Sequence, residues 1–325
     1  MKRKIANVII LLIFLAGLAI LLYPTVSDYV NEKNSSRAIA AYDQSAQDMA
    51  PEDYSQELEA AAAYNAYLAQ YGSLSAAASA EAKREDNPYE TLLNAGGNGV
   101  MAVIRIPCVD INLPVYHGTD EAVLQVAAGH YLGSSLPVGG PGTHAVITGH
   151  RGLPSARLFT DLDRLEIGDV FYIKVLGEIL EYEIDQIQTV LPSELDSLSI
   201  TPGEDYVTLV TCTPYGINSH RLLVRGKRVE YDGNYEEKVP IKPAPENLDL
   251  PPEERGNGLS ERQWILIAAV AFAAAILLGL LIPGKKKIPG EVEPETDAGR
   301  NRKRKRKTAE GSKTEKKEGS HENET

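Results

Sequence analysis

The chain has 325 residues, a formal net charge of −12, 43% hydrophobic residues and 24% charged residues. This length suits one globular domain with extensions, and the ordinary apolar, glycine and proline content excludes a collagen-like, wholly disordered or multi-span membrane protein. The two cysteines, Cys108 and Cys212, are too few for a disulfide scaffold and lack the spacing of a zinc or redox motif. The net acidity argues against nucleic acid as a partner.

Two uncharged apolar segments, Ile5–Tyr23 and Trp264–Pro283, flank the centre of the chain. As a helix, each is roughly 30 Å long, which is the thickness of the hydrocarbon core of a bilayer. Basic residues precede the first segment at positions 2–4 and follow the second at positions 285–287, so the positive-inside rule places both termini in the cytoplasm. We therefore expect a two-pass protein of the cell membrane whose acidic central part lies on the extracellular face.

Each apolar segment has an alternative interpretation. The first also fits a cleaved signal peptide, but it is longer than the usual ~7–15 apolar residues and Tyr23-Pro24-Thr25-Val26 follows in place of a small-residue cleavage site. The second resembles the tail of a surface protein anchored to the cell wall, but such a tail needs a Leu-Pro-x-Thr-Gly signal, and residues 254–259 read Glu-Arg-Gly-Asn-Gly-Leu. Uncleaved anchors are favoured, and either outcome for the first segment exports the central domain.

The segment after the first span is predicted to be helical. Its composition between Ser35 and Gln70 favours two helices joined at positions 49–51, and residues 72–86 are predicted to form a loop. A short helix is expected over Pro88–Asn94, with Asp86 or Asn87 as its cap and Pro88 in its first turn.

From Gly99 the pattern changes to alternating β-branched residues bounded by Pro and Gly, which predicts strands. They are expected at Val100–Ile106, Ile111–Val115, His144–Thr148, Val170–Val175, Ile179–Val190, Tyr206–Thr211 and Arg221–Val229, with a hairpin turn at 176–178. Because no long helical pattern separates them, we predict an all-β barrel or sandwich with short helical insertions such as Ser155–Leu165.

The candidate chemistry centres on Cys212, which closes a predicted strand just before a Pro/Gly turn, while Arg221 opens the next strand. If these strands pair antiparallel, the thiol and the guanidinium meet at one loop. A cysteine nucleophile needs a nearby cation, and the oxyanion of acyl transfer needs a donor. Arg221 fits the second role and could bind the substrate backbone.

Acyl transfer also needs a group that gives and takes protons, and His150 is the best candidate because it lies between Gly149 and Arg151-Gly152 at the end of a strand. His144 shares its predicted face, but no third ligand appears at metal-binding spacing, so no metal or other cofactor is expected. The remaining histidines, at 117, 130 and 220, have no assigned role, and Cys108 is interpreted as a packing residue.

These residues alone indicate an exported cysteine acyltransferase or protease. A papain-like protease is disfavoured, since that class places its cysteine at a helix N-terminus. A non-catalytic membrane-tethered adhesin or assembly scaffold remains the alternative from another class.

Several motifs add a family resemblance. They are Tyr116-His117-Gly118-Thr119, Gly129-His130-Tyr131, Leu136-Pro137-Val138-Gly139-Gly140, Thr148-Gly149-His150-Arg151-Gly152-Leu153-Pro154, Phe159-Thr160-Asp161-Leu162, and Thr211-Cys212-Thr213-Pro214-Tyr215-Gly216 followed by Arg221. The stretch resembles the sortases, the membrane-anchored cysteine transpeptidases of Gram-positive bacteria, and within them the class C group that polymerises pilins.

The resemblance implies an eight-stranded β-barrel and a catalytic triad of His150, Cys212 and Arg221. It implies cleavage of an LPxTG-like sorting signal between Thr and Gly, a thioacyl enzyme, and transfer to a lysine amine of a pilin subunit. The partners would be LPxTG-bearing pilins or surface proteins, and the lipid bilayer. Anchoring of surface proteins to cell-wall peptide is the alternative role.

One departure concerns the lid that class C enzymes often carry as an Asp-Pro-aromatic motif. The nearest match, Asp86-Asn87-Pro88-Tyr89, contains an inserted residue, so we expect the lid to be atypical or absent.

The expected organisation follows from these features. It comprises a cytoplasmic N-terminus at 1–4, a transmembrane signal anchor at 5–23, an extracellular helical extension with the possible lid at 24–98, the catalytic barrel at 99–230, an acidic Pro-rich tether at 231–263, a transmembrane helix at 264–283 and a basic disordered cytoplasmic tail at 284–325.

Overall fold

The computed structural model of the chain describes residues 2–237 and 239–243. The predicted second transmembrane helix at 264–283, the tail at 284–325 and most of the predicted tether lie outside the described residues.

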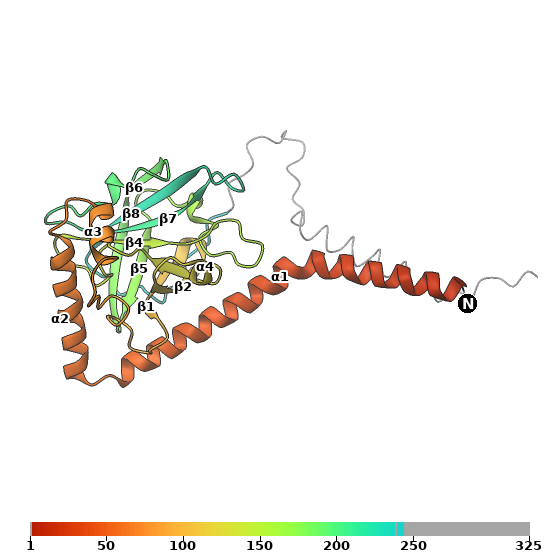
Figure 1. Cartoon of the computed structure of the whole chain (residues 1–325), viewed down its shortest axis with the longest axis horizontal. Helices are drawn as coiled ribbons and strands as arrows, with labels where there is room; N and C mark the ends of the chain where they lie inside the picture. The colour runs from red at the N-terminus through yellow and green to blue at the C-terminus, as the bar shows by residue number, and fades with distance from the viewer. Residues whose placement is uncertain (1, 238, 244–325) are drawn as a thin grey trace, which may run out of the picture. The chain divides into compact units, whose positions relative to one another are not determined.

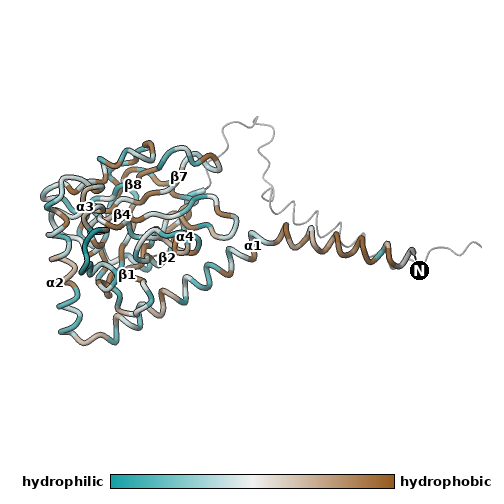
Figure 2. Tube along the Cα trace, in the orientation of Figure 1, coloured by the Kyte–Doolittle hydropathy of each residue, from teal (hydrophilic) through white to brown (hydrophobic). Residues whose placement is uncertain are grey.

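The first helix is longer than expected. Helix α1 runs without interruption from Lys2 to Asp48, with Pro24 inside it, so the predicted anchor and the first predicted extracellular helix are one element (Figure 1). The hydropathy of the chain changes along it, because its amino-terminal part is apolar and its later turns are mixed (Figure 2). Within the part of the chain that the structure describes, α1 is the one helix long and apolar enough to cross a membrane.

The segment between α1 and the barrel differs from the prediction in two places. Helix α2 (Pro51–Leu68) begins at the expected joint, but helix α3 (Leu74–Glu81) lies where a loop was predicted. The hydroxyl of Ser73 caps α3 by accepting from the amide of Ala76 at 3.3 Å. The expected helix at 88–94 is only a turn. Asn87 does cap this turn, since its side-chain oxygen accepts from the Tyr89 amide at 2.9 Å.

Eight strands close into a barrel in the order β1-β2-β3-β4-β7-β8-β6-β5. They are β1 (Val100–Ile106), β2 (Ile111–His117), β3 (Ala128–His130), β4 (Thr143–Thr148), β5 (Val170–Val175), β6 (Glu178–Val190), β7 (Asp205–Thr213) and β8 (His220–Val229). Two neighbouring pairs are parallel, β2 with β3 and β4 with β7, and the other pairs are antiparallel. The eight-stranded barrel is therefore confirmed, although the three-residue strand β3 was missed.

The connections are short. Helix α4 (Glu121–Leu124) precedes β3, and single 3₁₀ turns occupy Pro107–Val109, Leu162–Arg164 and Asp196–Leu198. The helical insertion predicted at 155–165 is thus reduced to the turn at 162–164. The hairpin turn predicted between β5 and β6 is present at Leu176-Gly177. Both residues have positive φ.

Alternation along the strands separates two faces. Ile147 of β4, Leu209 of β7 and Val224 of β8 point into the barrel, where they are fully buried in the main core. Their neighbours Val146, Val210 and Leu223 point outwards and form a second apolar cluster on the outer surface. Since side chains two residues apart share a face, Cys212 lies on the same outer face as Val210.

Helix α1 is fixed to the barrel at several points. The Tyr42 hydroxyl donates to the carbonyl of Met101 at 2.9 Å and accepts from the amide of Leu176 at 2.8 Å, and Lys174 pairs with Asp43 at 2.7 Å. These contacts lie at the end of the barrel that holds the β5–β6 hairpin turn.

The first part of the predicted tether also packs on the barrel. Tyr235 is buried against Tyr172, with ring centroids 5.7 Å apart. The amide of Lys242 donates to the carbonyl of Cys108 at 2.7 Å. The residues predicted to begin the tether are therefore in contact with the barrel.

Candidate active site

The parallel pairing of β4 and β7 brings His150 to Cys212. The last paired residues of these strands are Thr148 and Val210, and the amide of Gly149 donates to the carbonyl of Val210 at 3.1 Å. The hydroxyl of Thr211 closes the connection by donating to the carbonyl of Gly149 at 2.8 Å. Extending this register by two residues on each strand places His150 beside Cys212.

The antiparallel pairing of β7 and β8 brings Arg221 to the same point. Cys212 and Arg221 are directly paired in this ladder, as the strand–turn–strand pattern predicted. One guanidinium nitrogen of Arg221 donates to the carbonyls of Asn218 and His220 at 3.2 and 3.1 Å. These bonds hold Arg221 at the mouth of the β7–β8 loop.

His150 has a free ring nitrogen. Its Nε2 is buried without a hydrogen-bond partner among the described residues, and it lies 3.7 Å from a carboxylate oxygen of Glu121 on α4. The histidine backbone is fixed, because its carbonyl accepts from the amide of Phe159 at 3.1 Å. A Cβ at Gly149 would stand 2.9 Å from the Phe159 ring, so glycine is needed before the histidine. A fixed imidazole with an unpaired nitrogen is suited to proton transfer.

Arg151 was not singled out from the sequence, yet it connects the histidine loop to the cysteine loop. Its side chain is buried, pairs with Asp163 and donates to the Thr213 hydroxyl at 3.2 Å. Its guanidinium also lies over the ring of Tyr215, 5.8 Å from the centroid. The only signal in the sequence was its position directly after His150.

The two cysteines differ in environment, and both are free. Cys108 packs on the main core, where burial raises the pKa of its thiol to about 11. A thiol with a raised pKa is a poor nucleophile at neutral pH. This agrees with the interpretation of Cys108 as a packing residue and leaves Cys212 as the candidate nucleophile.

Three other histidines serve the structure. His130 is fully buried, and its ring nitrogens contact the Tyr89 hydroxyl at 3.0 Å and the carbonyl of Ser135 at 2.8 Å. His117 bonds the carbonyls of Gly99 and Leu92 through its two ring nitrogens. His144 lies against Thr208 and Ser199. Burial lowers the pKa of His130 and of His144 to about 4, so both are neutral at pH 7.

No group of three His, Cys, Asp or Glu side chains in the described part of the chain is arranged to hold a metal ion.

The residues of the possible lid bond to groups outside the candidate trio. Tyr89 is buried, and its hydroxyl accepts from the amide of Gly118 and contacts a ring nitrogen of His130 at 3.0 Å. Asp86 is exposed and pairs with Arg84 at 3.3 Å.

Another segment packs beside the trio. Leu74 of α3 lies on the outer apolar cluster formed by Val146, Leu198 and Leu223, with Val210 at its edge. Val210 and Leu223 are each two residues from Cys212 and Arg221 along their strands. An apolar surface therefore continues from the trio towards α3.

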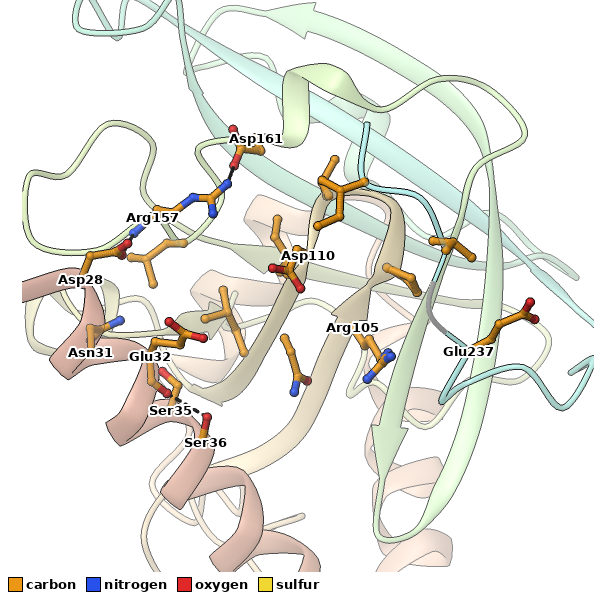
Figure 3. Close-up of a pocket in the computed structure, with 18 residues that line it drawn as sticks. Asp28, Asn31, Glu32, Ser35, Ser36, Arg105, Asp110, Arg157, Asp161 and Glu237 are labelled. Carbon is orange, nitrogen blue, oxygen red and sulfur yellow. Dashed lines mark hydrogen bonds and ion pairs between the residues drawn. The ribbon is translucent and has the colours of Figure 1, made fainter. Parts of the chain in front are cut away.

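A cavity of about 530 Å³ is lined by none of the trio. It lies between α1 and the turn joining β1 to β2, where Asp28 and Glu32 of the helix face Asp110 and Arg157 (Figure 3).

Comparisons with known proteins identify the family of this fold. The family described as the sortase domain matches residues 104–229. Sortase C1 from Streptococcus agalactiae is 45% identical, with 60% of this chain and 100% of that chain covered and a TM-score of 0.56. A structure described as sortase C1 of GBS pilus island 1 is 42% identical, with 61% and 93% covered and a TM-score of 0.53.

Among curated proteins, sortase A of Streptococcus agalactiae serotype III (strain NEM316) is 33% identical over 117 residues. The match covers 35% of this chain and 47% of that protein, so the chain spans about half the length of this relative.

Proposed function

Since the chain belongs to the sortase family of cysteine transpeptidases and is similar to its class C members, we propose that it joins pilin subunits covalently at the cell surface. It would cleave an LPxTG-like sorting signal, hold the released acyl group on Cys212 and transfer it to a lysine amine of the next subunit. The observation that carries the proposal is the convergence of Cys212, Arg221 and His150 from two strand pairs.

In the first half of the reaction, Cys212 as the thiolate, with His150 protonated, attacks the carbonyl carbon of the Thr–Gly bond. Arg221 donates to the oxyanion that forms. His150 gives its proton to the glycine nitrogen, the Thr–Gly bond breaks, and a thioester remains on Cys212. The unpaired Nε2 of His150 is the group that can carry this proton.

In the second half, the lysine amine attacks the thioester carbonyl and loses a proton to His150. The carbon–sulfur bond breaks, and an isopeptide bond links the two pilin subunits. His150 returns to its protonated form and Cys212 to its starting form, so the cycle closes without a cofactor or metal.

The outer apolar cluster supports an extended peptide substrate. Val210 and Leu223 follow the catalytic row on the same face of β7 and β8. A sorting signal lying across these strands would displace Leu74 of α3, place its apolar residues on this surface and bring its scissile bond to Cys212.

We further propose that residues 86–89 do not act as a lid. Tyr89 is held by hydrogen bonds to Gly118 and His130, and Asn87 supports the turn that positions it. The segment that covers the surface next to the trio is α3, through Leu74. Leu74→Ser would then increase the rate of thioacyl formation, and Tyr89→Phe would leave it unchanged.

The two-pass topology, with the catalytic domain outside the cell and both termini in the cytoplasm, is part of the proposal. The apolar part of α1 supports the first membrane anchor. The second anchor rests on the sequence of residues 264–283 alone.

The test uses the full chain in nanodiscs with a fluorogenic LPxTG peptide and a pilin domain bearing an acceptor lysine. Mass spectrometry would follow an adduct on Cys212 and a lysine-linked product, with Cys212→Ala as control. A lysine-linked product that the control lacks supports the proposal. An adduct released only by water or by a glycine-type amine would indicate cell-wall anchoring, and no adduct with any sorting peptide would indicate a non-catalytic scaffold.

A further inference from the structure

The end of the barrel that carries the trio also carries the contacts nearest to the membrane span. This catalytic end is formed by the carboxyl ends of β1, β4, β6 and β7 and the amino ends of the other four strands. At this end, Asp28 of α1 accepts from the amide of Arg157 at 2.8 Å, and Asn31 donates to the carbonyl of Val126 at 3.1 Å. Tyr42 and Asp43 contact the opposite end.

Helix α1 therefore descends along the barrel from its catalytic end to its opposite end, and the apolar run continues beyond the catalytic end. Because the helix is continuous from Lys2, distances along it follow from its rise. Asp28 is five residues past Tyr23, which corresponds to about 7.5 Å along the helix axis. Asn31 is eight residues past Tyr23, which corresponds to about 12 Å. The headgroup layer of one leaflet is roughly 5–8 Å thick. Loops bonded to Asp28 and Asn31 are thus held at the membrane surface.

Exposed large hydrophobic side chains gather at this same end. The loops at the catalytic end hold five such side chains, each 46–71% exposed: Val126, Ile167, Leu191, Tyr215 and Ile217. Val239 and Ile241 lie next to Lys242, which bonds the β1–β2 turn at this end. Among the described residues outside α1, the one other exposed large hydrophobic is Tyr231, just past the opposite end of β8.

We propose that the catalytic end rests on the outer surface of the bilayer, with Ile217 and Tyr215 of the β7–β8 loop in the lipid interface. Tyrosine and aliphatic side chains are favourable at the boundary between headgroups and acyl chains. Acidic residues such as Glu121 and Glu166 also lie at this end, so the contact depends on apolar burial and on the position of α1, and not on attraction to anionic lipid. Cys212 then opens towards substrates whose sorting signals are held at the membrane.

The test measures depth, and it does not need catalysis. The full chain, with Cys108→Ala and Cys212→Ala, receives a single cysteine at Ile217→Cys, or at Thr201→Cys as the control. Thr201 is exposed and precedes β7 at the opposite end. Each cysteine is labelled with an environment-sensitive fluorophore in phosphatidylcholine nanodiscs that contain a nitroxide on the upper acyl chain.

We expect the nitroxide to quench the label at 217 at least threefold more than the label at 201, at low and at high salt. Leu191→Cys, in the neighbouring loop, should follow 217. Equal quenching at 217 and 201, or none at 217 and 191, would overturn the proposal and would indicate that these side chains contact substrate instead.

A change in α1 gives a second readout. Seven residues inserted between Ser27 and Asp28 add about two helical turns, roughly 10 Å, and keep nearly the same helix face towards the barrel. The insertion should abolish the quenching at 217. Quenching that persists would show that α1 does not set the position of the barrel, and would contradict the account. Because the labelled protein carries Cys212→Ala and quenching does not require catalysis, a negative result would reject the proposed membrane contact without bearing on the proposed transpeptidase function.

Discussion

The loop after β4 and the short β2–β3 pair beside it use the same residue type for opposite purposes. After β4, His150 keeps a ring nitrogen without a hydrogen-bond partner among the described residues. On the β2–β3 pair, both ring nitrogens of His117 and of His130 are bonded within the chain. A buried polar group without a partner is costly. The unpaired nitrogen therefore distinguishes His150, the candidate proton carrier, from the bonded histidines.

The largest expected effect tests the division between the cysteines. Cys212→Ala should reduce transpeptidation at least 10³-fold, to background, since the other thiol, Cys108, packs on the core and burial raises its pKa to about 11. Cys108→Ala is the matched control and should retain activity within about twofold, since its thiol packs on the core. Initial rates with the fluorogenic peptide measure both. Equal loss in the two variants would contradict the assignment.

Next comes the division between the histidines. His150→Gln should lower kcat/KM by about 10²–10⁴, because proton transfer to and from the reacting nitrogen is lost. His220→Gln serves as the control at the same end, where its ring is bonded to the Ser219 hydroxyl at 2.9 Å. It should change the rate by less than about threefold. A larger loss in His220→Gln than in His150→Gln would reverse the assignment.

Arg221→Lys should reduce kcat by about 10²–10³, in the range seen when one oxyanion donor is removed. Arg225→Lys is the control, four residues further along β8 and on the same face, where it pairs with Asp185 at 2.9 and 2.8 Å. It should keep nearly full activity, because its partner is structural. If both variants lose activity to the same extent, Arg221 contributes only positive charge and does not donate directly to the oxyanion, which would contradict its assigned role.

Two buried histidines predict a dependence of stability on pH. His130 and His144 have folded-state pKa values of about 4, below the ordinary value of 6.5. Their contribution is complete above pH 6.5 and is lost as the pH falls towards 4, because the unfolded chain then binds the protons first. Each should contribute on the order of 3 kcal/mol.

Denaturant unfolding of the full chain at pH 7 and pH 4.5 measures this loss, with His130→Gln as the comparison. The variant should show a shallower decline with falling pH than the native chain. Parallel declines would show that His130 is not the titrating group.

The smallest effect sharpens the comparison at Tyr89. Tyr89→Phe removes a hydroxyl that accepts from Gly118 and contacts His130, so the free energy of unfolding should fall by about 1–3 kcal/mol. The rate of acyl transfer should not change. A faster rate with unchanged stability would instead indicate that Tyr89 shields Cys212.

Part of the candidate site could be predicted because two of its residues are close together in the sequence. Cys212 and Arg221 lie on two strands joined by one tight turn, and a period-two pattern is enough to pair them. His150 needed a further step, because β4 and β7 are distant in sequence and pair in parallel. Its position at a strand end, between glycines, was the available signal.

The parts that were missed depend on long-range contacts or on weak local patterns. β3 has three residues, too few to show alternation. Helix α3 is rich in Ala and Ser and is held by Leu74 on the distant strands β4 and β8. The network around His130 joins segments 41 residues apart, and nothing near His130 in sequence announces Tyr89. These features depend on burial and on contacts between distant segments, which cannot be read from the local sequence pattern.

The most direct test of the central claim asks which thiol reacts with a sorting signal. The full chain would be treated with an LPxT peptide that carries a vinyl sulfone in place of the scissile amide, and the modified residue located by peptide mapping. The account predicts stoichiometric modification of Cys212 alone, slowed by His150→Gln and by Arg221→Lys. Modification of Cys108, or modification of Cys212 at an unchanged rate in both variants, would contradict it.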